Sequence, residues 1–239
     1  VATTTLTPHQ RAVRSTVAMK ALMAVTGLIL IAFLLMHMFG NLKMFIGADS
    51  FNHYAEWLKG QTADGGILYP ILPAGWFIWI FRVVLLAAVV LHIYSAVTLW
   101  SRALAANPTT YEAKRKLAQT YSARTMRWGG IILAGILLFH LLQFTVHATL
   151  IAGPFEDNPY KMVLGEFSIW WMVLVYAIWM VAVCMHIRHG FWSAFATLGA
   201  NTSAKARAIL NGCAWAVALI LYIGFMIMPV SVLFGWIGA

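Results

Sequence analysis

Residues 26–41 read TGLILIAFLLMHMFGN, an apolar run with a histidine at position 37 in its interior. The run belongs to a longer apolar segment, residues 18–42, which exceeds the roughly 20 residues that an α-helix needs to cross a bilayer core. Basic residues precede this segment, as they do in a signal peptide, but a signal peptide has an apolar core of only about 7–15 residues. The segment therefore predicts a membrane-spanning helix that is retained.

The rest of the chain has the composition of a membrane protein. Of its 239 residues, 62% are hydrophobic and only 10% are charged, against roughly 25% charged residues in a soluble domain. This composition excludes a soluble or disordered protein, and the sparse basic charge excludes a nucleic-acid-binding face. Four further apolar segments are long enough to span: residues 74–103, 126–152, 168–196 and 209–234. We expect an all-α integral membrane protein, a bundle of five transmembrane helices in a single domain, residues 1–239.

The distribution of Lys and Arg predicts the orientation of the bundle, because cytoplasmic loops of membrane proteins carry an excess of both. With the N-terminus inside, the external segments hold only Lys43, Lys59 and Lys161. The cytoplasmic segments then hold Arg11, Arg14, Lys20, Arg102, Lys114, Arg115, Lys116, Arg124, Arg127, Arg188, Lys205 and Arg207. We therefore expect a cytoplasmic N-terminus and an external C-terminus.

Each of the first four predicted spans carries one histidine in its apolar interior: His37, His92, His140 and His186. Ionisable residues inside a membrane are costly and usually functional, and histidine is an axial ligand of haem iron. A single histidine in an apolar helix is more often a packing residue. One in each of four helices is harder to explain in that way.

The depths of the four histidines sort them into two pairs. His92 and His186 each lie 18 residues past the start of an inward-running span, roughly 27 Å from the outer surface. His37 and His140 lie 19 and 14 residues into outward-running spans, roughly 21–29 Å from the inner surface. Two bis-histidine haems stacked across the membrane need this arrangement.

Other residues near these depths have alternative interpretations. His147 and His189 lie near the external and internal interfaces, where each is either a ligand or a hydrated interfacial residue. Arg82 lies inside the second span, where a haem propionate, the Glu56 carboxylate, or snorkelling to the interface accounts for it. Gly129 shares a helix face with His140, which favours either the close approach of a macrocycle or a contact between helices.

The histidine motifs together resemble those of the diheme cytochrome b membrane anchors of succinate:quinone oxidoreductases, the single-subunit, five-helix type. The resemblance covers nearly the whole chain. The run at 26–41 is similar to the first ligand helix of that family. LHIYSA, LLFHLLQF and HIRHGFWSAF are similar to the other three ligand helices, and FNHYAEWL at 51–58 is typical of one branch.

The resemblance implies two haem b groups and selects their ligands. It selects His186 rather than His189, because Gly190 fixes the register, and His140 rather than His147. It pairs His92 with His186 on the haem nearer the cytoplasm, and His37 with His140 on the distal haem. The haem should be non-covalent, because the chain has no C-x-x-C-H motif.

The implied function is that of a non-head subunit of succinate dehydrogenase in the bacterial cell membrane. A flavoprotein and an iron–sulfur subunit would bind at the cytoplasmic face, and electrons would pass through both haems to a membrane quinone. Expected partners also include lipid and further copies of the complex. Two alternatives remain open: a diheme anchor of another quinone-linked dehydrogenase, and a non-haem membrane transporter.

Two locations compete for the quinone. We favour the external end, because a second haem is otherwise an unnecessary electron path. Electrons that cross to that end couple turnover to the membrane potential, at about 2.3 kcal/mol per charge per 100 mV, which favours menaquinone. The residues that could serve the quinone there are Tyr54, Glu56, Arg82 and His147. The alternative is the cytoplasmic rim, near Arg188, His189 and Trp192.

Overall fold

The computed structural model describes residues 7, 12, 15–106, 121–148, 151–153 and 158–238, and all regular structure among them is helical. The elements are α2 (Thr16–Leu42), η1 (Lys43–Phe45), α3 (Ala48–Lys59), α4 (Trp76–Ala105), α5 (Tyr121–Phe144), α6 (Pro159–Phe167), α7 (Trp170–Thr197) and α8 (Ala204–Leu233). The prediction of an all-α fold is confirmed.

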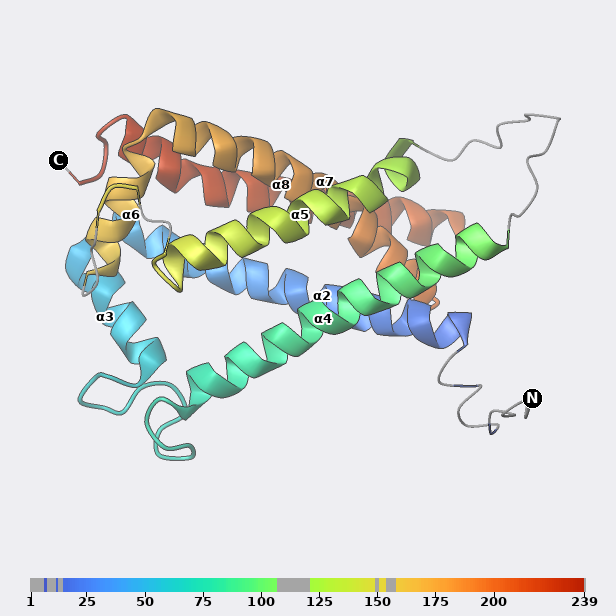
Figure 1. Ribbon diagram of the computed structural model, residues 1–239, viewed down its shortest axis with the longest axis horizontal. Helices are drawn as coiled ribbons and strands as arrows, with labels where there is room; N and C mark the ends of the chain where they lie inside the picture. The colour runs from blue at the N-terminus through green and yellow to red at the C-terminus, as the bar shows by residue number, and fades with distance from the viewer. Residues whose placement is uncertain are drawn as a thin grey trace.

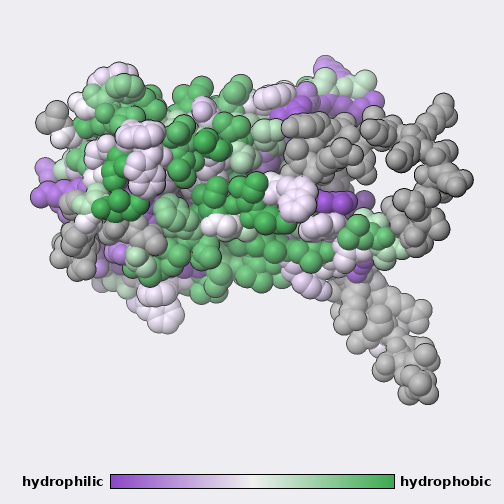
Figure 2. Space-filling view, turned by 45° about the horizontal axis from the view of Figure 1, so that its top comes forward, coloured by the Kyte–Doolittle hydropathy of each residue, from purple (hydrophilic) through white to green (hydrophobic). Residues whose placement is uncertain are grey.

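Five of the helices, α2, α4, α5, α7 and α8, are long and apolar enough to cross a membrane, as predicted. The isolated chain leaves large apolar side chains exposed along them, among them Trp79, Leu86 and Ile223. Figure 2 shows hydrophobic residues across the middle of the visible face, with hydrophilic residues gathered toward its two ends. A broad apolar surface of this kind fits contact with lipid rather than with water.

Three of the four other long helices pack against α2. Helix α2 packs against α4, α7 and α8, and α5 packs against α7. The start of α2 and the end of α8 lie at opposite ends of the bundle, and α3 and α6 lie at the same end as the end of α8 (Figure 1). We call this the α6 end. Its placement on the external side of a membrane stays a prediction.

Local sequence signals explain where several helices begin. The Ser15 side chain accepts a hydrogen bond from Ala18 N at 3.1 Å and caps α2, and Ser203 caps α8 in the same way. Asn158 caps α6, and Pro159 occupies its first turn. Serine and asparagine favour N-cap positions, and proline is suited to the first helical position.

Two boundaries at the α6 end differ from the prediction. The third long helix ends at Phe144 rather than at residue 152, and His147 beyond it adopts a left-handed φ of 60°. The segment before the fourth predicted span, in which no helix is predicted, contains α6. The Asn-Pro pair that favours turns is also the start signal of this helix.

The buried core lies mainly along α7 and α8 and extends to α6, and α2 packs against it. Met172 of α7 and Leu221 of α8 are fully buried in it. A side chain at Gly224 of α8 would collide with the Met38 side chain of α2, so the small residue allows these two helices to approach. Small residues have this role at helix contacts in membranes, where the hydrophobic effect does not drive helix association.

The link between α3 and α4 is held by glycines in close backbone contact. Gly60 ends α3 in the left-handed conformation, with φ 69° and ψ 29°. A Cβ at this position would collide with the backbone nitrogen of Gly75, which precedes α4. Glycine therefore meets two requirements here, a left-handed turn and space for the adjacent backbone.

Substitution of Gly60 by alanine should destabilise the chain more than substitution of Gly235. Both glycines have nearly the same φ, 69° and 68°, but a Cβ at Gly235 meets nothing within 4 Å. Conformational strain of about 1–2 kcal/mol is common to the two variants, and Gly60→Ala adds an overpacking cost of about 1–3 kcal/mol. Thermal unfolding midpoints in one detergent would measure the difference. Equal midpoints would show that the α3–α4 link accommodates the extra methyl group.

Candidate functional site

The structure brings the four histidines of the long helices together in two pairs. The rings of His37 on α2 and His140 on α5 have centroids 6.0 Å apart, with an interplanar angle of 80°. The rings of His92 on α4 and His186 on α7 have centroids 6.3 Å apart, with an angle of 64°. Each pair thus joins two helices, and the pairs are those that the sequence resemblance implies.

The ring separations fit two imidazoles on one metal ion. An imidazole nitrogen lies about 2 Å from a bound metal and roughly 1 Å from its own ring centroid, so two opposed rings have centroids about 6 Å apart. Gly130 of α5 lies beside one of these rings, since a Cβ there meets only His186, at 4.0 Å. A Cβ at Gly129 meets no atom within 4 Å. Gly129 is therefore not at a close helix contact.

His92 is held by the backbone of α2. Its Nδ1 lies 3.2 Å from the carbonyl oxygen of Met23 and 3.2 Å from Thr26 Oγ1. The Thr26 hydroxyl itself donates to Leu22 O at 2.7 Å. A carbonyl oxygen only accepts, so Nδ1 carries the proton and Nε2 is free to bind a metal. Gly27 allows this approach, since a Cβ there would lie 3.2 Å from the His92 ring.

His140 is held by side chains instead. Its Nδ1 lies 3.1 Å from the hydroxyl of Tyr176 on α7. The Tyr176 hydroxyl donates to Gln143 Oε1 at 2.6 Å, and Gln143 Nε2 donates to Glu166 Oε2. Gln143 and Glu166 are fully buried, and Tyr176 is 6% exposed. The ring nitrogen is thus connected to a buried carboxylate through two intervening side chains.

Glu166, at the end of α6, also holds the chain segment after α5. Its Oε1 accepts hydrogen bonds from the backbone N–H groups of Ile151 at 2.7 Å and Ala152 at 2.9 Å. A buried charge is costly unless it is fully hydrogen-bonded. Three N–H donors from α5 and from the segment after it meet this need.

Buried N–H or ring-nitrogen groups without partners occur next to both pairs. Among the described residues, His186 Nδ1 and Trp179 Nε1 are buried with no hydrogen-bond partner, and the Trp179 ring centroid lies 5.5 Å from that of His140. Such groups are rare in native proteins, because each costs about 1–3 kcal/mol. Their position fits sites that hold a polar cofactor between the helices.

The residues predicted to serve a quinone at the α6 end do not form one cluster with each other. Tyr54 is half-buried against Gly40, with Lys43 Nζ 5.1 Å from its ring centroid, and burial raises the pKa of its hydroxyl. The Arg82 guanidinium lies 5.0 Å from the Trp79 ring centroid. Within residues 15–106 it forms no ion pair with Glu56, whose side chain is exposed.

His147, the fourth of these residues, follows the end of α5 in an exposed position. At the opposite end of the bundle, Arg188 stacks on Trp215 at 4.4 Å and approaches Asn211 Oδ1 at 3.5 Å. His189 and Trp192 are half-buried beside it. Of the two histidines in this region, His186 is the one whose ring faces that of His92.

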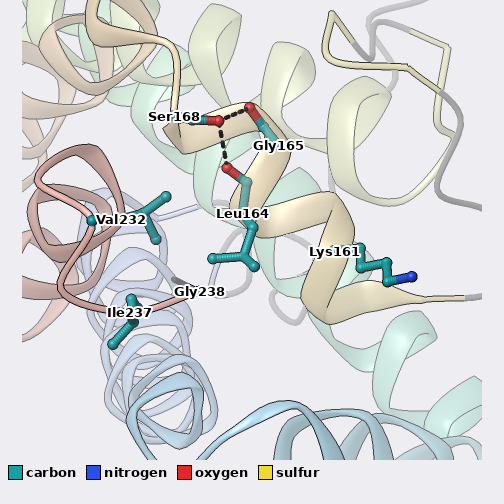
Figure 3. Close-up of a pocket in the computed structure, with 8 residues that line it drawn as sticks. Lys161, Leu164, Gly165, Ser168, Val232, Ile237 and Gly238 are labelled. Atoms are coloured by element: carbon teal, nitrogen blue, oxygen red, sulfur yellow. Dashed lines mark hydrogen bonds between the residues drawn. The ribbon is translucent and has the colours of Figure 1, made fainter.

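A pocket of about 380 Å³ opens at the α6 end, between α6 and the C-terminal end of α8. Leu164, Val232 and Ile237 form its apolar part, and Lys161 extends away from them (Figure 3). The Ser168 hydroxyl at its edge is bonded to the backbone oxygens of α6. The pocket contains none of the residues predicted from the sequence.

Glu166 and Tyr176 carry no motif that predicts a site. The signal that could have drawn attention to Glu166 is its place directly before an apolar span, in a chain with only 7 acidic residues.

Comparison of the chain with protein-family models, curated proteins and solved structures gives no match. The function is therefore inferred from the residues themselves.

Removal of the Glu166 carboxylate should loosen the segment after α5. In Glu166→Ala the amides of Ile151 and Ala152 lose their acceptor, so their hydrogen exchange should become faster by tenfold or more, given a cost of about 1–3 kcal/mol per unpaired group. Exchange measured by mass spectrometry on the full chain would test this. Ser168→Ala is the control, since its hydroxyl bonds only to α6 and its exchange at 151–152 should match the wild type. Unchanged exchange in Glu166→Ala would contradict the anchoring role.

Proposed function

We propose that the chain is the membrane-anchor cytochrome b of a succinate:quinone oxidoreductase. It holds two haem b groups, one between His37 and His140 and one between His92 and His186. The observation that carries this proposal is the meeting of four intramembrane histidines in two pairs, with ring centroids 6.0 and 6.3 Å apart. The sequence resemblance adds the identity of the partner enzyme.

The haem supplies one-electron redox chemistry when it is bound. The protein holds the ligand rings in place and keeps water away from them. His92 donates its Nδ1 proton to the Met23 carbonyl, and His140 donates its Nδ1 proton to Tyr176. Hydrogen bonds of this kind fix the ring orientation and raise the basicity of a ligating histidine. Apolar side chains of α2, α7 and α8 surround the His37 pair, with Phe33 and Phe225 against the His37 ring.

The partners follow from this role. A flavoprotein subunit oxidises succinate, and an iron–sulfur subunit carries the electrons to the anchor, both at the cytoplasmic face of a bacterial cell membrane. The end opposite the α6 end faces these subunits in this proposal, since it contains the start of α2 and most of the basic residues that the structure describes: Lys20, Arg102, Arg127, Arg188, Lys205 and Arg207 (Figure 1). With the haems bound, electrons would leave the anchor for a membrane quinone, menaquinone.

The haem content of the purified chain tests the proposal. Two b-type haems per chain are expected from a reduced-minus-oxidised spectrum, and acid–acetone extraction should release all of the haem. Ligand variants extend this experiment. His37→Ala and His140→Ala should both lose one haem, and His92→Ala and His186→Ala should both lose the other, because each haem iron would lose a protein ligand.

His189→Ala is the matched control, because this histidine lies one helical turn from His186 and should leave both haems in place. A haem-to-chain ratio near zero in the wild type would reject the function. Loss of a haem in His189→Ala, with retention in His186→Ala, would reject the ligand assignment.

We further propose that the quinone is reduced at the α6 end, where α3 and the segment after α5 both lie. Glu56→Gln and His147→Ala, made separately, should slow quinone reduction by about tenfold or more, as expected for loss of a positioned proton donor. Succinate oxidation with a soluble artificial acceptor should stay normal in both variants. His189→Ala and Trp192→Ala test the opposite rim: a loss of quinone turnover there, with none at the α6 end, would move the site.

A further inference from the structure

We infer that Glu166 is a positioning residue that selects the tautomer of His140 through a hydrogen-bond chain of fixed direction. The chain runs from His140 through Tyr176 and Gln143 to Glu166. This inference rests on the proposed function, in which His140 binds a haem through an unprotonated Nε2.

The direction of the chain originates at Glu166. A carboxylate has acceptor sites only, and the two backbone amides of Ile151 and Ala152 already occupy Oε1. Oε2 therefore needs a donor, and in the structure it accepts from Gln143 Nε2. The remaining Gln143 amide hydrogen points to Met172 Sδ, 3.6 Å from the nitrogen. Because both hydrogens of its nitrogen are used in this way, Gln143 must turn its carbonyl oxygen toward Tyr176.

The same logic passes from Gln143 to His140. The Gln143 carbonyl only accepts, so Tyr176 donates its hydroxyl proton to it at 2.6 Å. A phenol has one proton, so toward His140 the Tyr176 oxygen can only accept. The His140 Nδ1, 3.1 Å away, must therefore carry a proton. A neutral imidazole has a single N–H, which leaves Nε2 in the form that binds a metal.

The two histidine pairs fix the tautomer of a ring in different ways. His92 faces a backbone carbonyl, Met23 O, which is always an acceptor and fixes the tautomer in one step. His140 faces a phenol, which can donate or accept. The phenol alone leaves the tautomer undetermined, and the buried carboxylate two residues further along the chain removes the ambiguity. Full burial of Gln143 and Glu166 excludes competing water from these bonds.

Glu166→Gln should reverse the direction of the hydrogen-bond chain, with almost no change in the shape of the side chain at 166. The glutamine oxygen can still accept from Ile151 and Ala152, so its NH2 group would face the NH2 group of Gln143. Gln143 must then rotate its amide by half a turn and donate to Tyr176. The Tyr176 proton turns toward His140 Nδ1, and the His140 proton moves to Nε2, where it blocks metal binding.

A swap of the two side chains provides the rescue. In the double variant Gln143→Glu with Glu166→Gln, the carboxylate at 143 accepts from Tyr176, and it also accepts from the new amide at 166. The oxygen of that amide still holds the two backbone N–H groups. The original direction is restored, with the same atoms in nearly the same places.

Haem occupancy of the full chain in nanodiscs is the first measurement. Glu166→Gln should reduce occupancy of the His37–His140 site by about tenfold or more, as the loss of hydrogen bonds that orient a ligand does, and shift the potential of any haem that remains there. The double variant should return occupancy to within about twofold of the wild type. The His92–His186 haem is the internal control and should be unaffected in both.

Nitrogen-15 spectra of histidine-labelled full chain, prepared without haem, are the second measurement. They read the His140 tautomer directly, with His140→Gln identifying its signal: Nδ1–H in the wild type and the double variant, Nε2–H in Glu166→Gln. Normal occupancy and an unchanged tautomer in Glu166→Gln would overturn the inference. Equal losses in the single and double variants would also overturn it, because direction would then not matter. A wild-type chain that takes up no haem but has the Nδ1–H tautomer would reject the proposed function and leave the positioning role intact.

Discussion

A histidine inside a bilayer needs a partner for each ring nitrogen, because no water is present to supply one. This constraint accounts for how the histidine-bearing helices are arranged. Four apolar helices each present one histidine, and the rings meet in two pairs with centroids 6.0 and 6.3 Å apart. Nδ1 of His92 and Nδ1 of His140 are each hydrogen-bonded to the protein. The space between the two rings of each pair is then the place where a metal-bearing group would fit.

For His92 and His140 the protein meets the constraint with two kinds of partner, and each kind needs different surroundings. A backbone carbonyl serves His92, which requires α2 and α4 to lie close together, and Gly27 permits that contact. Side chains serve His140, which requires a polar network inside an apolar bundle. Such a network is stable only when all its members are paired, and the fully bonded Glu166 meets this condition.

Much of this arrangement could be predicted from the sequence. Five apolar runs of sufficient length define the long helices, and the positions of the histidines within them suggest the pairs. The end of α5 and the presence of α6 could not be predicted in the same way, because Asn158-Pro159 is compatible with both a turn and a helix start. The hydrogen-bond network around Glu166 could not be predicted from the sequence either. Its members are far apart in the chain, and no periodic pattern relates a carboxylate at 166 to a tyrosine at 176 or a glutamine at 143.

Helix α2 contributes to both pairs, with His37 in one and the Met23 carbonyl supporting His92 in the other. These two positions are 14 residues apart on one rigid rod, so the levels of the two pairs are separated by roughly 21 Å along it. Helix α2 thus sets the spacing between the two histidine pairs. Changes in the loops at the ends of α2 leave this spacing in place. A single residue inserted between 27 and 37 would instead turn one end of α2 by about 100° relative to the other, so this stretch can change in composition but not in length.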